Sequence, residues 1–163
     1  MNIFLPYEED IERSVRSLDD KRLNKSILEC KQLLINALKE EMGYCITGYK
    51  NHPIYLHYKS NPYFLATYGY KCCVEYQYRF HKSHSLTHQF MTYISIEEID
   101  IERVSYTPFY MEGSKNSPNS IRTTENVSER YQKKLIDKWD TDKAKGRPPK
   151  WTNREIPIFY KEK

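Results

Sequence analysis

Residues 17–43, SLDDKRLNKSILECKQLLINALKEEMG, decide the fold. Apolar residues recur through this stretch at the three- and four-residue spacing of one buried helical stripe: Leu23, Ile27, Cys30, Leu34, Ala37 and Leu38. Ser17 and Asp20 stand three residues apart, as in the box that caps a helix N-terminus, and Gly43 stands where a C-terminal glycine is expected. The stretch therefore predicts one long amphipathic helix that has Ser17 as its cap.

Two prolines downstream of this helix are suited to the first turn of further helices. Pro53 follows the loop 47–52, and Pro62 precedes an apolar series that continues to about His81. We therefore expect a second helix from Pro53 and a third from Pro62.

The C-terminal half is less regular. Residues 91–104 mix β-branched residues with acids and fit either a short strand or a helix, and residues 113–126, GSKNSPNSIRTTEN, have the composition of a mobile surface loop. Helical spacing returns in residues 131–139, and a basic, aromatic tail occupies residues 145–163. The sequence predicts a mainly α fold: a compact single domain over residues 1–163, with three to four helices, irregular loops and the tail.

Composition limits the class of protein. The chain has 163 residues, of which 39% are hydrophobic and 29% charged, which excludes a membrane protein and a disordered chain. The net charge of +4 and the pI of about 8.7 permit a polyanionic partner. The four cysteines include the adjacent pair Cys72 and Cys73 and no CxxC, so neither a disulfide framework nor a zinc ribbon is indicated. We expect a cytoplasmic protein.

Glu29 is the first candidate for chemistry. Arg22, Ser26 and Glu29 share one side of the predicted helix, beside its apolar stripe. Spacing alone leaves two interpretations open. Glu29 is either a boundary residue paired with Arg22 or Lys25, or a catalytic carboxylate whose pKa is raised beside basic groups.

Two strings together resemble the pyrimidine-dimer DNA glycosylase/AP lyase family, the endonuclease V type of phages and bacteria. One runs from Leu18 through Glu29 to Leu34, and the other is GYKNHP at residues 48–53. RPPKW at residues 147–151 is similar to the basic, aromatic C-terminus of that family. The resemblance covers about residues 1–82, and residues 91–128 find no match.

The resemblance implies a catalytic group made of Met1, Asn2 and Glu29. In that family the α-amino group of the chain attacks the sugar C1′ and one helical glutamate assists it. An α-amine, with a pKa of about 7.7 to 8.0, is neutral far more often at pH 7 than a lysine with a pKa of about 10.4. Asn2 is bulky and hinders removal of the initiator methionine, so Met1 is expected to supply the amine. The chemistry requires no cofactor and no metal.

DNA contacts are expected from basic, polar and aromatic residues in the matched strings and in the tail: Arg22, Lys25, Lys50, Asn51, His52, Arg147, Lys150, Trp151 and Arg154. Two of these have an open structural alternative, since His52 could cap a helix and Trp151 could pack on the core. Leu28 stands where the family usually has an arginine, which makes the lesion specificity the least defined feature.

The expected function is DNA repair: nicking at an altered or missing base through an imine. The expected partner is double-stranded DNA with a lesion or abasic site, and no membrane partner is expected. We expect a monomer in the cytoplasm of a bacterial or phage-infected host cell. Alternatives are a nickase that cuts only abasic sites left by another glycosylase, for example after uracil removal, and a catalytically silent DNA-binding module. A metal nuclease that uses His81, His84 and His88 has the least support, because neighbouring residues weaken a helix there.

Overall fold

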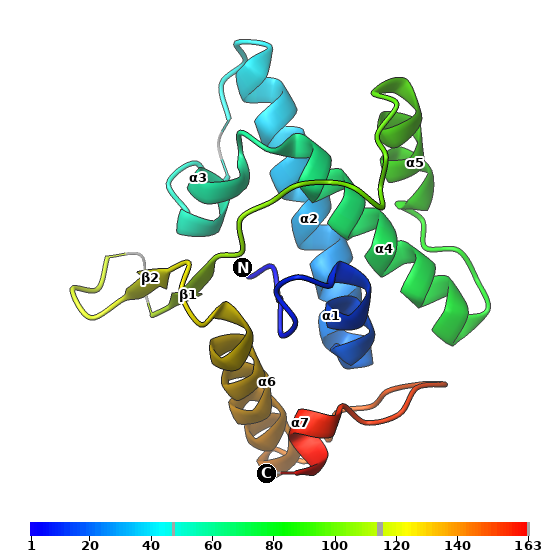
Figure 1. The fold of residues 1–163 in the computed structure, drawn as a ribbon, viewed down its shortest axis with the longest axis vertical. Helices are drawn as coiled ribbons and strands as arrows, with labels where there is room; N and C mark the ends of the chain where they lie inside the picture. Colours follow the sequence, from blue (N-terminus) through cyan, green and yellow to red (C-terminus); the bar gives the residue numbers. More distant parts are fainter. Residues whose placement is uncertain (47, 114–115, 163) are drawn as a thin grey trace.

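The long helix α2 (Asp20–Glu41) packs along α4 (Pro62–Phe80), and the other elements are arranged around this pair (Figure 1). The computed structural model describes residues 1–46, 48–113 and 116–162. In that part of the chain the other helices are α1 (Ile11–Ser17), α3 (Pro53–Tyr58), α5 (Thr87–Ile96), α6 (Val127–Ala144) and α7 (Ile158–Lys161). The predicted mainly α fold class is confirmed, and none of the described helices is long and apolar enough to span a bilayer.

The start of α2 differs from the sequence prediction. Ser17 ends α1, where its hydroxyl donates to the backbone of its own helix (2.8 Å), and the N-cap position of α2 is Asp19. Leu18 between them is extended, so the stretch forms two helices joined at a corner. The Asp19 carboxylate accepts from Arg22 Nη1 (3.0 Å) and Trp139 Nε1 (2.7 Å). The prediction of Ser17 as the cap was therefore wrong, because the chain turns at Leu18 and Ser17 belongs to the helix before the turn.

Helices α3 and α4 begin where the prolines predict. His52 Nδ1 accepts from a backbone N–H in the first turn of α3 (3.2 Å), and Asn61 Oδ1 does the same in α4 (3.0 Å). Pro53 and Pro62 occupy the first turns, where a missing N–H costs nothing. Helix α4 ends at His81, whose φ of 53° is left-handed.

The irregular C-terminal half contains more structure than its composition indicates. Helix α5 occupies the first part of residues 91–104, and turns follow. Strand β1 (Tyr110–Glu112) pairs antiparallel with β2 (Ile121–Thr123), which falls inside the expected loop 113–126. Residues 114–115 of that expectation, residue 47 of the loop before α3 and residue 163 of the tail lie outside the described residues. Helices α1 and α7 are additions to the three or four that the sequence predicts, and α5 is the helical outcome of the choice left open for residues 91–104.

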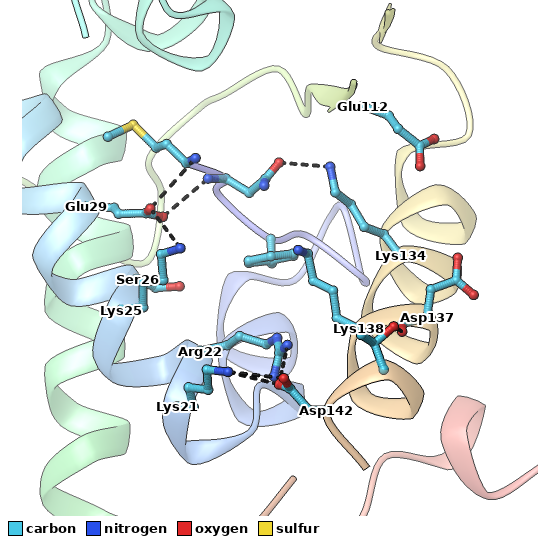
Figure 2. Close-up of a pocket in the computed structure, with 14 residues that line it drawn as sticks. Lys21, Arg22, Lys25, Ser26, Glu29, Glu112, Lys134, Asp137, Lys138 and Asp142 are labelled. Atoms are coloured by element: carbon cyan, nitrogen blue, oxygen red, sulfur yellow. Dashed lines mark hydrogen bonds and ion pairs between the residues drawn. The ribbon is translucent and has the colours of Figure 1, made fainter. Parts of the chain in front are cut away.

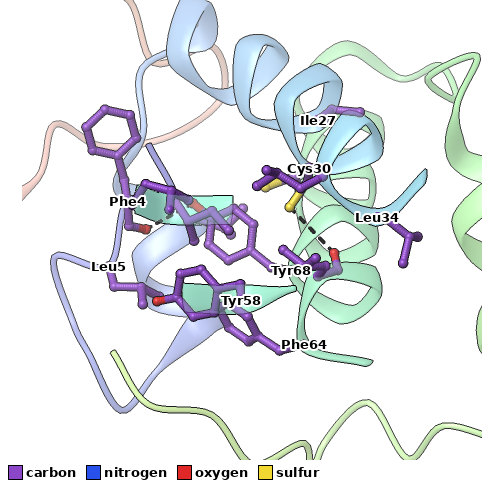
Figure 3. Packing of buried hydrophobic residues seen from close by; sticks show 14 of the residues in the cluster. Phe4, Leu5, Ile27, Cys30, Leu34, Tyr58, Phe64 and Tyr68 are labelled. Atoms are coloured by element: carbon purple, nitrogen blue, oxygen red, sulfur yellow. Dashed lines mark hydrogen bonds between the residues drawn. The ribbon is translucent and has the colours of Figure 1, made fainter. Parts of the chain in front are cut away.

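The first residues of the chain belong to the core (Figure 3). Ile3, Phe4 and Leu5 are buried, and the Tyr68 hydroxyl of α4 donates to the Phe4 carbonyl (2.9 Å). Around them lie buried aromatic residues such as Phe64. Because these residues are packed and hydrogen-bonded, the chain terminus is held at a defined place against α2.

The tail attaches α6 to the corner between α1 and α2. Trp151 packs edge-on against the fully buried Trp139 of α6, with 4.9 Å between ring centroids, and its Nε1 donates to the Ser17 carbonyl (3.0 Å). The Lys150 carbonyl accepts from the Asp20 amide (2.8 Å). These contacts fix the position of α6 relative to α2.

We expect Trp151→Ala to lower the free energy of unfolding by about 2 kcal/mol, since the change removes a packed ring and a hydrogen bond. Denaturant unfolding measures the loss. Lys150→Ala is the matched control, because the Lys150 side chain is exposed, and should cost less than about 0.5 kcal/mol. Equal stability of the two variants would show that the Trp151 ring does not anchor the tail.

Candidate active site

The terminal amine of the chain lies beside the Glu29 carboxylate (Figure 2). The Met1 nitrogen is 3.8 Å from Glu29 Oε1, and the Asn2 backbone N–H donates to Oε2 (3.3 Å). Lys25, one turn earlier on α2, places its Nζ 3.6 Å from Oε1. The Glu29 side chain is only 14% exposed. The carboxylate is therefore shared between the first two residues of the chain and one lysine.

Burial lowers the pKa of the Met1 terminal amine below its usual value of about 8. The Glu29 carboxylate opposes this shift, and the positive charges of Lys25, Lys134 and Lys138 add to it. More of this amine is neutral at pH 7 than of a free α-amine. Only the neutral form carries a lone pair that can attack a carbon.

A pocket of about 450 Å³ opens between the N-terminal segment, α2, α6 and the end of β1 (Figure 2). Its volume is in the range of small-molecule sites. Its charged lining residues, besides the terminal amine, are Lys21, Arg22, Lys25, Glu29, Glu112, Lys134, Asp137, Lys138 and Asp142. Basic groups outnumber acidic ones, which suits a negatively charged ligand.

Arg22 is committed to contacts within the fold. Its guanidinium donates from Nη1 to Asp19 Oδ2 (3.0 Å) and from Nη2 to Asp142 Oδ2 (2.8 Å), and its side chain is 9% exposed. Lys21 Nζ is 3.1 Å from the same Asp142 oxygen. The hydrogen bonds from Arg22 and Lys21 lower the pKa of Asp142 to about 2. Asp142 thus joins α6 to α2 at one side of the pocket.

The first half of the chain matches a known protein family. A family model described as pyrimidine dimer DNA glycosylase matches residues 1–88, more than half of the chain. The chain belongs to this family. Searches of curated proteins and of solved structures give no significant match.

The match to the pyrimidine dimer DNA glycosylase family includes Met1, Asn2 and Glu29 but ends before the hairpin and α6. Sequence reasoning missed the pocket residues of that second half, Lys134 and Lys138 among them. Burial and the Lys138 charge lower the pKa of Lys134 to about 8. The four-residue interval between the two lysines places them on one face of the predicted helix, but no sequence pattern indicates that this face turns toward residue 29.

The predicted contacts Lys50, Asn51 and His52 lie in the loop before α3 and do not line this pocket. Lys50 and Asn51 are exposed. His52 caps α3, as the structural alternative for this residue expects. Their contact with DNA stays a prediction.

The tail residues also lie away from the pocket lining. Arg147 and Lys150 are exposed, whereas Trp151 is half-buried in the packing described above. Arg154 donates to both oxygens of the buried Glu75 carboxylate (2.9 and 2.8 Å). The structural alternative therefore accounts for the contacts of Trp151. Among the predicted tail contacts, Arg147 and Lys150 are the two with exposed side chains.

The three histidines of the metal alternative have separate contacts. His84 Nδ1 accepts from the Leu86 amide (3.1 Å), His88 shares a hydrogen bond with Thr92 (3.2 Å), and His81 lies near Asn153. Within the described residues, no group of three or more His, Cys, Asp or Glu is arranged to hold a metal ion.

Proposed function

We propose that this chain is a DNA glycosylase/AP lyase in which the Met1 amine forms an imine with the sugar of the damaged nucleotide. One observation carries the proposal: a terminal amine of lowered pKa lies 3.8 Å from a largely buried carboxylate, in a pocket lined by several lysines. Membership of the pyrimidine dimer DNA glycosylase family supports DNA as the substrate.

The amine acts as nucleophile at the sugar C1′. Its lone pair attacks C1′ as the bond to the base breaks, and the base leaves with a proton. The bond from C1′ to the ring oxygen then opens, the ring oxygen takes up a proton to become a hydroxyl, and a protonated imine remains on C1′. The positive imine acidifies the C2′ hydrogens, so removal of one of them expels the 3′-phosphate and nicks the strand. At an abasic site the same amine condenses with the C1′ aldehyde and releases water.

Glu29 is suited to move protons in these steps. Its carboxylate can accept a proton from the attacking amine and stabilise the cationic imine, because it lies beside the nitrogen and is shielded from bulk water. The surrounding lysines can hold the phosphates that flank the damaged sugar. The duplex has to be distorted at the damaged nucleotide before C1′ can reach the amine, as in other enzymes that act on bases within a duplex.

A set of three duplexes tests the proposal: one with a cyclobutane pyrimidine dimer, one with an abasic site and one undamaged. We expect nicking of the first two, and a covalent adduct with each when borohydride reduces the imine, with or without a chelator. Nicking of abasic DNA alone would favour the abasic-site nickase. Binding without nicking or adduct would overturn the enzymatic function in favour of a silent binding module.

The exposed tail charges give a separate prediction. Replacing Arg147 and Lys150 together by glutamine should flatten the dependence of log K on log salt by about one for each lost phosphate contact. Fluorescence anisotropy at several salt concentrations measures this slope, and a thermal melt confirms the fold. An unchanged slope would show that the tail contributes structure only.

A further inference from the structure

Lys134 joins three parts of the chain at the edge of the pocket (Figure 2). From α6, its Nζ donates to Asn2 Oδ1 (3.2 Å) and to the Met111 carbonyl of β1. Asn2 is the neighbour of the terminal amine, and β1 belongs to the hairpin. One side chain therefore ties the N-terminal segment to a hairpin that lies outside the family match.

Asn2 is held from two sides. Its side-chain oxygen accepts from Lys134, and its backbone N–H donates to Glu29. The attacking nitrogen belongs to the preceding residue, so a rotation of Asn2 would swing the amine away from the carboxylate. The two hydrogen bonds limit that rotation.

Lys134 is itself anchored. Its Nζ lies 4.9 Å from the centre of the Tyr110 ring and 6.0 Å from that of Tyr131, on the faces that attract cations. Tyr131, one turn earlier on α6, is fully buried, and its hydroxyl donates to the Phe109 carbonyl (2.9 Å). A half-buried ammonium with these partners has little freedom to move.

We propose that Lys134 is a positioning residue, which acts through Asn2 to fix the terminal amine beside Glu29. We call the two hydrogen bonds that Lys134 donates, to Asn2 and to the Met111 carbonyl, the clamp. This inference rests on the proposed function, since the clamp serves the imine-forming step. The Met111 carbonyl anchors the clamp to the hairpin.

The test compares Lys134→Gln and Lys134→Arg with Lys133→Gln, an exposed neighbour outside the pocket. Single-turnover borohydride trapping on abasic DNA gives the rate of imine formation. We expect a loss of roughly 10- to 100-fold for Lys134→Gln, the scale of a misplaced reacting group, with DNA affinity changed far less. Lys134→Arg keeps the charge and the donors and should recover much of the rate, while Lys133→Gln should match the parent chain.

Asn2→Leu tests the same clamp from its other end, because leucine removes the acceptor and is bulky enough to keep Met1. It should lose about as much rate as Lys134→Gln, and the double variant should lose little more, since both changes break one interaction. If Lys134→Gln fails to fold, Asn2→Leu decides alone. A parental rate in either folded variant overturns the proposal.

A readout independent of DNA is the pH dependence of α-amine labelling by a small acylating reagent, followed by mass spectrometry of the N-terminal peptide. The charged groups around the amine are Glu29 and Lys25 of α2, Lys134 and Lys138 of α6, and Glu112 of β1. Loss of the Lys134 charge raises the amine pKa, so the labelling midpoint should move to higher pH in Lys134→Gln and stay in Lys134→Arg.

The outcomes separate the two proposals. If the parent chain forms no adduct with abasic DNA, the proposed function fails and the clamp proposal fails with it. If the parent chain forms the adduct and folded Lys134→Gln forms it as fast, the proposed function stands and Lys134 has no positioning role.

Discussion

Glu29→Gln is expected to reduce imine trapping and strand nicking by at least about 10²-fold while duplex binding changes little. General acid–base assistance is worth about 10²- to 10⁴-fold, and glutamine keeps the size and shape of the side chain but cannot take up a proton. Single-turnover nicking and anisotropy titrations measure the two quantities.

A second effect of Glu29→Gln acts in the opposite direction. The Glu29 charge raises the pKa of the terminal amine, so its removal makes more of the amine neutral. A free α-amine, with a pKa of about 7.7 to 8.0, is roughly one-tenth neutral at pH 7, and the lowered pKa of the Met1 amine makes its neutral fraction larger, so this gain stays below about tenfold. The loss of proton transfer therefore dominates.

The matched control for Glu29→Gln is Glu41→Gln, an exposed carboxylate at the end of the same helix and outside the pocket. It should leave nicking unchanged. A Glu29→Gln variant that retains most of its rate would remove Glu29 from the mechanism.

Blocking the terminal amine is expected to abolish the trapped adduct altogether. Acetylation or an N-terminal extension turns the amine into an amide, whose lone pair is delocalised and does not attack C1′. An extension that a protease removes back to Met1 provides the control, because cleavage should restore the adduct. DNA binding should persist in the blocked chain, since the pocket lysines remain.

An adduct that survives the block would assign the attack to a lysine. Lys21 and Lys25, which share α2 with Glu29, pair with Asp142 and Glu29 respectively. Lys134 is the stronger rival in the structure, because burial lowers its pKa to about 8. In its neutral form the Lys134 amine can donate both hydrogens to Asn2 and Met111 and still has a lone pair for attack. Blocking the terminal amine therefore distinguishes attack by Met1 from attack by Lys134.

The long helices could be predicted because periodic burial leaves a pattern in the sequence. The stripe from Leu23 onward in α2 is such a pattern, and the prolines mark the starts of α3 and α4. Helix α1 and the hairpin were missed because they are short and gain their stability from tertiary contacts. Asp19, for example, occupies the N-cap position of α2, but its carboxylate binds Arg22 and Trp139.

The candidate site also contains residues that the sequence could indicate and residues that only tertiary contacts bring together. The placement of Met1 beside Glu29 follows from the resemblance and agrees with the structure. Arg22 was expected to contact a phosphate, but in the structure it donates to Asp142 of α6. The sequence does not show this pairing, because the two residues are far apart in the chain. Lys134 could not be predicted at all, since contacts between residues 132 positions apart leave no periodic signal.

The most direct test of the central claim is peptide mapping of the adduct that borohydride fixes on abasic DNA. After digestion of the DNA and the protein, mass spectrometry locates the reduced sugar fragment. The account predicts the fragment on the α-nitrogen of Met1, with every lysine unmodified. A fragment on the Nζ of Lys134, or of any other lysine, would contradict it.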